Sequence, residues 1–116
     1  MIAIPKLILA SASPRRAEIL RTTGWSFETL AVDIDESRQA GEDAATYVQR
    51  LARAKAEAAA VRCANFPIIG ADTVVVIDGE VLGKPCDEED TRRMLRRLSG
   101  QWHQVLTGVA LLNGPP

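Results

Sequence analysis

The segment from Ile68 to Ile77 constrains the fold of this chain more than any other, because most of its residues are apolar. A run that is apolar on both faces predicts a strand in the interior of a sheet. Asp78-Gly79 follows directly and is typical of a two-residue turn, so residues 80–82 are predicted to return as the second strand of a hairpin. Such a strand needs neighbouring strands and helices to cover it.

Alternating strand and helix signals occupy the rest of the chain. Strands are predicted at residues 6–10, 26–32 and 102–112, and helices that begin at Pro14, Asp43 and Asp87 end at Gly24, about Ala64 and Gly100. The second helix has an apolar stripe formed by Tyr47, Val48, Leu51, Ala52, Ala58 and Ala59. The order β-α-β-α-β-β-α-β indicates an α/β fold with a mixed central sheet flanked by helices. No internal repeat or linker is visible, so residues 1–116 are predicted to form a single domain.

Charge and cysteine content exclude several classes of protein. The 14 basic and 15 acidic residues give a net charge of −1, which provides no overall attraction for a nucleic acid polymer or an anionic membrane. The apolar runs are too short to span a bilayer, and no signal peptide is recognisable. Cys63 and Cys86 fit no zinc or redox motif, so we expect reduced thiols in a cytoplasmic protein, with a single disulfide as the alternative.

A serine- and arginine-rich loop lies between the first strand and the first helix. Ser11 and Ser13 supply hydroxyl groups, Pro14 suits the first helical position, and Arg15 and Arg16 follow it. The first turn of a helix carries unpaired N–H groups and partial positive charge, so two arginines there favour a bound anion, most simply a phosphate. The alternative is a solvated basic turn in which the serines only cap the helix.

Two charged residues lie in apolar surroundings. Asp72 interrupts the most apolar strand, where an ionised carboxylate is costly unless it is paired, protonated or bound to a cation. A metal ligand or a general base explains it, and so does a carboxylate satisfied by backbone donors or by an arginine. Lys55 lies within the apolar stripe of the second helix, from which its ammonium group extends either into a cleft or out to solvent.

Glu36 and Lys84 complete the candidate set, and His103 is not part of it. Glu36, in an acidic loop, is expected to reach a metal ion that Asp72 also binds, which would give the oxygen ligands that Mg²⁺ prefers; otherwise the loop is simply solvated. Lys84 lies between Gly83 and Pro85 and is rigidly presented, although a surface lysine is the simpler interpretation. His103 is interpreted as a hydrogen-bonded structural residue on the last strand. A serine nucleophile has little support, because the chain holds no second histidine.

Several segments in register resemble the Maf-like nucleoside triphosphate pyrophosphatases. They are SASPRR (residues 11–16), LARAKA (51–56), GADTVV (70–75), VLGKP (81–85), MLRRLSG (94–100) and HQVLTGV (103–109). The resemblance implies the Maf/ITPase-like, anticodon-like nucleotide-binding α/β architecture. It also implies hydrolysis between the α and β phosphorus atoms of a nucleoside triphosphate, with a divalent cation (Mg²⁺, Mn²⁺ or Co²⁺), to give a nucleoside monophosphate and pyrophosphate.

The resemblance assigns roles to individual positions. Asp72 matches the catalytic carboxylate that accepts a proton, and Glu36 with Asp72 would hold the metal ion. The remaining matches are Lys55 and Lys84 with Glu36 as charged site residues, Arg15 and Thr73 for substrate choice, and Ser11, Ser13 and Arg16 in the phosphate-binding loop. The segments 71–73 and 103–105 look like those of family members acting on dTTP and UTP rather than on 7-methyl-GTP, and similar enzymes also remove modified pyrimidine nucleotides.

Length is where this chain departs from the resemblance. Members of the family continue past Pro116 with further strands, a helix and a glycine-rich segment that helps to close the cleft, so the similarity is expected to cover the first two-thirds of a full member. A homodimer is compatible with the resemblance. Two other functions stay open, namely a nucleotide-binding fragment without turnover and a regulator of cell division and septum formation.

Overall fold

The computed structural model describes residues 6–63, 66–82 and 87–112, and its elements follow the predicted order. The strands are β1 (Leu7–Ala10), β2 (Phe27–Thr29), β3 (Ile68–Ile77), β4 (Glu80–Leu82) and β5 (Gln104–Leu112), and the helices are α1 (Pro14–Arg21), α2 (Ala44–Ala60) and α3 (Glu88–Leu98). The predicted mixed α/β fold is therefore confirmed. No helix in the described ranges has the length and hydropathy needed to cross a membrane.

Strand β3 lies at the centre of the five-stranded sheet that the described residues form, because it pairs with β1, β4 and β5. Strand β5 pairs with it antiparallel along nearly its whole length, from Ile68 to Val76. On the opposite edge β1 pairs in parallel up to Gly70, and β4 pairs antiparallel from Val75 onwards. The stretch of β3 between these two partners, which contains Asp72 and Thr73, therefore has no described strand on that edge. The site described below forms around this gap.

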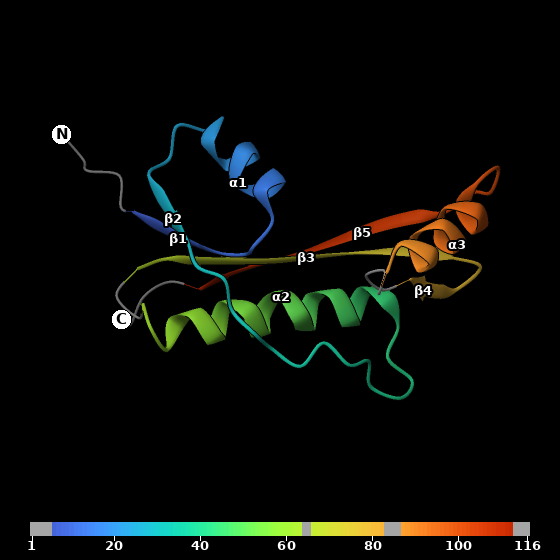
Figure 1. Ribbon diagram of the computed structural model, residues 1–116. Coiled ribbons are helices and arrows are strands. Elements are labelled where there is room, and N and C mark those ends of the chain that lie inside the picture. The colour runs from blue at the N-terminus through green and yellow to red at the C-terminus, as the bar shows by residue number, and fades with distance from the viewer. Residues whose placement is uncertain (1–5, 64–65, 83–86, 113–116) are drawn as a thin grey trace.

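The two faces of the sheet are covered differently (Figure 1). Helix α2 lies along one face, and α1 lies on the opposite side, near β1 and β2. Two glycines let α2 approach closely: a Cβ atom at Gly70 would lie 2.1 Å from the carbonyl oxygen of Ala52, and one at Gly108 would lie 2.6 Å from that of Val48. Buried side chains of α2, among them the fully covered Leu51, pack on this face. The core is therefore concentrated between α2 and the β3–β5 pair.

Residues at the helix starts and at the hairpin turn predicted several of the element boundaries. Ser13, Asp43 and Asp87 cap the three helices through their side-chain oxygens. The sequence predicted the cap at Ser13, and it placed the starts of the other two helices at Asp43 and Asp87, one residue before their first helical residues. Asp78-Gly79 forms the hairpin turn, with both residues at positive φ.

Four sequence predictions were wrong in detail. Helix α2 ends at Ala60 rather than near Ala64, and β2 contains only three residues. Within α2 it is Ala56, not Ala58, that is fully buried. His103 precedes β5 instead of lying on it, and its exposed ring contacts the carbonyl oxygen of Gln101 at 3.3 Å.

Candidate functional site

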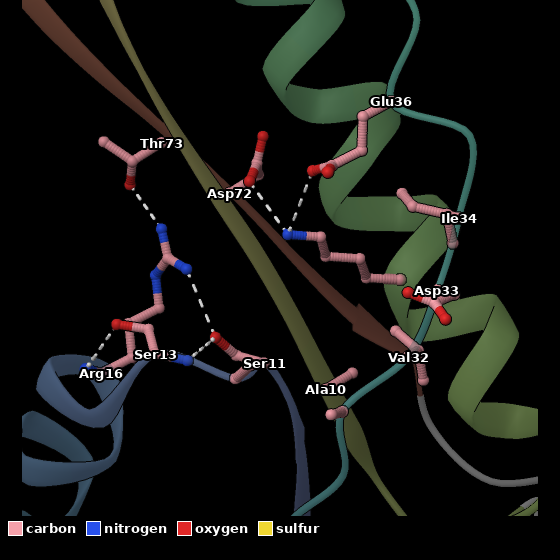
Figure 2. Close-up of a pocket in the computed structure, with 13 residues that line it drawn as sticks. Ala10, Ser11, Ser13, Arg16, Val32, Asp33, Ile34, Glu36, Asp72 and Thr73 are labelled. Atoms are coloured by element: carbon pink, nitrogen blue, oxygen red, sulfur yellow. Dashed lines mark hydrogen bonds and ion pairs between the residues drawn. The ribbon is translucent and has the colours of Figure 1, made fainter. Parts of the chain in front are cut away.

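A cavity of about 560 Å³ opens beside the unpaired stretch of β3. Its walls come from four segments: the loop after β1, the loop after β2, the middle of β3 and one residue of α2. The lining residues are Ala10, Ser11, Ala12, Ser13, Arg16, Ala31, Val32, Asp33, Ile34, Glu36, Lys55, Asp72 and Thr73. Figure 2 shows that the polar side chains form two groups, one around Arg16 and one that includes Asp72 and Glu36. Seven of the predicted site residues are thus brought together.

The serine loop holds the Arg16 side chain in place. The Ser13 hydroxyl oxygen accepts the backbone N–H of Arg16 at 3.4 Å, and the buried Ser11 hydroxyl oxygen accepts Arg16 Nη1 at 3.3 Å. The other guanidinium nitrogen, Nη2, donates to Thr73 Oγ1 at 2.6 Å. Serine capping of α1 is therefore real, yet the same loop also directs a guanidinium group into the cavity. Capping and anion binding are compatible uses of these serines.

Thr107 extends this group, although it was not among the predicted site residues. Its Oγ1 atom lies 3.0 Å from Thr73 Oγ1, within hydrogen-bond distance. Thr73 and Thr107 are direct partners in the β3–β5 register, which places both side chains on the same face of the sheet. Only the strand pairing, which joins segments 34 residues apart, reveals this contact.

Asp72 points to the opposite face of the sheet, where Lys55 reaches it from α2. Lys55 Nζ donates to Asp72 Oδ1 at 3.0 Å and lies 3.8 Å from Glu36 Oε1. The side chains of Lys55 and Asp72 are only 12% and 8% exposed, whereas Glu36 is 43% exposed. Lys55 therefore enters the cleft instead of extending to solvent, and within the described residues the partner of the buried Asp72 carboxylate is this lysine rather than an arginine or a backbone donor.

The donor set can be tested against a divalent cation. No cluster of three or more His, Cys, Asp or Glu side chains suited to a metal ion occurs within the described residues. Magnesium, however, is commonly held by one or two carboxylates together with substrate phosphates and water. Glu36 and Asp72 line the same cavity, where the Lys55 ammonium group is the cation that contacts both carboxylates. A metal ion held by these two carboxylates would therefore need phosphate and water oxygens as its remaining ligands.

Two predicted site residues, Arg15 and Lys84, are not among the described residues that line this cavity. Arg15 is exposed and does not line the first cavity; it borders a second one of about 560 Å³, in which Ile19, Val105 and Val109 are among the apolar lining residues. Arg16 and Thr73 border both cavities. Lys84 and Cys86 lie outside the described residues, and Cys63 is a free thiol.

Comparison with known proteins identifies the family. Residues 6–115 match the family model described as Maf-like protein. The chain belongs to the Maf-like family. Among similar curated relatives, the dTTP/UTP pyrophosphatase of Escherichia coli strain K12 is 54% identical over 106 residues, which cover 90% of this chain and 54% of that protein. The dTTP/UTP pyrophosphatase of Pseudoalteromonas atlantica is 57% identical over 112 residues, covering 93% of this chain and 58% of that protein.

The length comparison corrects one prediction. This Maf-like chain spans about half the length of the curated relatives it matches, not two-thirds. Among solved structures, the Staphylococcus aureus Ham1 protein superposes with a TM-score of 0.61 at 17% identity, covering 95% of this chain and 64% of that protein. At this identity the likeness concerns the fold alone, and it agrees with the Maf/ITPase-like architecture.

Proposed function

We propose that this Maf-like chain binds a nucleoside triphosphate, dTTP or UTP, and hydrolyses it between the α and β phosphorus atoms to the monophosphate and pyrophosphate. The observation that carries the proposal is a single cavity in which a guanidinium group and a Lys–Asp–Glu cluster face one space. Anion-binding groups next to carboxylates are what metal-assisted phosphoanhydride hydrolysis requires. The names of the relatives support the choice of dTTP and UTP.

The serine loop is proposed to hold the phosphates. Arg16 offers a planar fork of donors, and the hydroxyl hydrogens of Ser11 and Ser13 remain able to donate while their oxygens accept. These groups lie at the N-terminus of α1, whose partial positive charge favours an anion. Lys55, together with Lys84, is proposed to neutralise further phosphate charge.

Glu36 and Asp72 are proposed to hold the divalent cation, Mg²⁺, Mn²⁺ or Co²⁺. When bound, such an ion neutralises the triphosphate and polarises the attacked phosphoryl group. Asp72 is proposed as the proton acceptor, because its carboxylate lines the cavity and is paired with the Lys55 ammonium group. Lys55 then serves two purposes, since it compensates Asp72 in the free protein and is within reach of a bound phosphate.

Substrate choice is proposed to depend on Arg15 and Thr73. Both border the second, mostly apolar cavity, which adjoins the first at Arg16 and Thr73. A base or sugar placed there would lie beside phosphates held in the first cavity, and modified pyrimidine nucleotides are candidate substrates as well. We further propose that residues 1–116 form one Maf-like domain, that the protein acts in the cytoplasm, and that it forms a homodimer.

The test is pyrophosphate release by this chain from dTTP, UTP, CTP, GTP and ATP in the presence of Mg²⁺. We expect release from dTTP and UTP, and a loss of at least about a hundredfold in Asp72→Asn, as is usual for removal of a positioned acid–base group. Asp78→Asn is the matched control, because this carboxylate lies in the hairpin turn and lines neither of the two site cavities.

Two results would contradict the proposal. Equal release by Asp72→Asn and by the wild-type chain would remove Asp72 from the reaction. Triphosphate binding without release, by a chain shown to be folded by circular dichroism, would identify a nucleotide-binding protein without turnover.

A further inference from the structure

Glu36 reaches the site from a loop without regular secondary structure. Between β2 and α2 the backbone runs in irregular conformation over the length of α2 (Figure 1). Glu36 points from this loop toward Asp72 (Figure 2), and its Oε1 atom lies 3.8 Å from Lys55 Nζ. An irregular segment of this length loses its position readily, because each residue gains conformational entropy when it is released. Something must therefore hold the loop against the helix that carries Lys55.

Tyr47 provides the first point of attachment. It lies on α2 and is 9% exposed, with its ring packed among Val48, Leu51 and Val74. Its hydroxyl donates to the backbone carbonyl oxygen of Glu36 at 2.5 Å. Burial, together with the negative charges of Asp72 and Glu36, raises the pKa of Tyr47, so the hydroxyl remains a donor. The donor therefore fixes the backbone at the residue whose side chain faces Lys55.

Arg50, one turn further along α2, provides the second point of attachment for the loop. Its Nε and Nη2 atoms donate to the two carboxylate oxygens of Glu42 at 2.7 and 3.0 Å, and Nη2 also donates to the carbonyl oxygen of Ser37 at 2.8 Å. The Glu42 side chain is 4% exposed, and the hydrogen bonds from Arg50 hold the pKa of that carboxyl below its ordinary value. A bidentate pair of this kind fixes orientation as well as distance.

Glu42 in turn binds the loop from within. Its Oε1 atom accepts the backbone N–H of Gln39 at 3.1 Å, and its carbonyl oxygen accepts Arg38 Nη2 at 2.8 Å. The guanidinium groups of Arg38 and Arg50 lie 5.9 and 5.6 Å from the centre of the Tyr47 ring. The loop on both sides of Glu36 is thus tied to one surface of α2.

We propose that Tyr47, Arg50 and Glu42, here called the loop anchor, are positioning residues that fix the Glu36 carboxylate relative to Lys55. Because Tyr47, Arg50 and Lys55 belong to the same helix, the anchor makes the loop and the Lys55–Asp72 pair move as one body. Small displacements of a catalytic group are costly in rate, so pre-organised positions matter. This proposal rests on the proposed function, because positioning Glu36 affects the rate only if Glu36 takes part in the hydrolysis.

Two measurements test the loop anchor, and the first does not require turnover. Tyr47→Phe removes only the hydroxyl and keeps the ring in the core. We expect the rate of native-state tryptic cleavage after Arg38 to rise about tenfold in this variant, as local opening becomes easier. Arg53→Gln is the matched control, because Arg53 lies on the exposed side of α2 and pairs with Glu57. An unchanged rate in Tyr47→Phe would overturn the proposal.

The second measurement separates positioning from mere stability. For pyrophosphate release from dTTP, we expect Tyr47→Phe to lower kcat/KM about tenfold, the size usual for loss of a supporting hydrogen bond. In a Glu36→Gln background the same substitution should have almost no further effect, because the group being positioned is gone. An equal loss in both backgrounds would overturn the proposal. If the wild-type chain shows no turnover, the proposed function fails, while faster cleavage after Arg38 in Tyr47→Phe still supports the anchor.

Glu42→Gln provides an independent variant, because it keeps the shape of the side chain but removes the charge that pairs with Arg50. Like Tyr47→Phe, this variant should be cleaved faster after Arg38 than the wild-type chain. Cleavage at the wild-type rate would contradict the part assigned to the Arg50–Glu42 pair.

Discussion

Helices α2 and α3 have similar beginnings and different surroundings. Each is capped by an aspartate whose side chain accepts a backbone N–H three residues later. Helix α2 buries six residues against the sheet, whereas α3 buries none. Instead α3 has acidic residues in its first turn, arginines in its last turn, and side-chain pairs three and four residues apart, such as Arg92 with Glu88. One helix is held by packing and the other by local interactions.

This difference explains where the candidate site is built. A helix fixed by close packing can hold a side chain at a defined position, and α2 carries Lys55 together with two residues of the loop anchor. Interactions along an exposed helix each contribute only a few tenths of a kcal/mol, so α3 has far less to resist movement. The comparison can be tested with matched substitutions in the two helices.

The largest effect is expected from leucines. Leu51 is 1% exposed and Leu95 is 61% exposed. Leu51→Ala should lower the free energy of unfolding by about 2–5 kcal/mol, because it leaves a cavity between α2 and the sheet. Leu95→Ala should change it by less than about 0.5 kcal/mol. Urea unfolding followed by circular dichroism measures both, and similar losses would mean that α3 is packed as tightly as α2.

The second-largest difference is expected between two ion pairs, the buried Lys55–Asp72 pair of α2 and an exposed pair of α3. Lys55→Met leaves the buried Asp72 carboxylate without its partner and should cost about 3 kcal/mol, the lower end for a buried pair, because the cavity admits water. Arg97→Met breaks an exposed pair with Glu80 and should cost less than about 1 kcal/mol. Unfolding in urea at low and high salt checks both values. A larger loss from Arg97→Met would reverse the comparison.

A cap substitution should produce a smaller, local effect. Asp87→Ala removes the N-cap of α3 at a cost of about 1 kcal/mol. Since α3 buries no residue, we expect this loss as faster amide hydrogen exchange within residues 88–98, with the global unfolding midpoint nearly unchanged. Asp87→Asn, which retains the cap, is the control. A clear drop in the global midpoint for Asp87→Ala would show that α3 unfolds together with the core.

The smallest effect at neutral pH is expected at the other cap. Hydrogen bonds from Thr46 hold the pKa of Asp43 below its ordinary value of 3.8. A depressed folded-state pKa contributes stability above the unfolded value, and that contribution is lost as the pH falls through the folded value. Asp43→Asn keeps the cap without titrating, so it should match the wild-type protein at pH 7 and lose less stability below about pH 4. If the free energy of unfolding falls equally with pH in the wild-type protein and in Asp43→Asn, this prediction is contradicted.

Sequence reasoning located the members of the candidate site better than their contacts. Asp72 and Lys55 were singled out because each charge lies in an apolar pattern, and burial at those positions confirms the signal. Their pairing was not predicted, because it joins α2 to β3. Thr107 and the loop anchor were missed, since a threonine in a strand and a tyrosine in an apolar stripe look like ordinary structural residues. The roles of the site residues stay predictions.

What the sequence by itself determined are the features that depend on near neighbours. The three aspartate and serine caps, the Asp78-Gly79 turn and the order of the elements are of this kind, because a cap or a tight turn is complete within about four residues. The tertiary structure alone decided that β1 and β4 leave a gap along β3, that Asp72 lies on the face of the sheet from which Lys55 approaches, and that α3 buries nothing. These outcomes depend on strand register and packing between distant segments, which only the whole fold fixes at once.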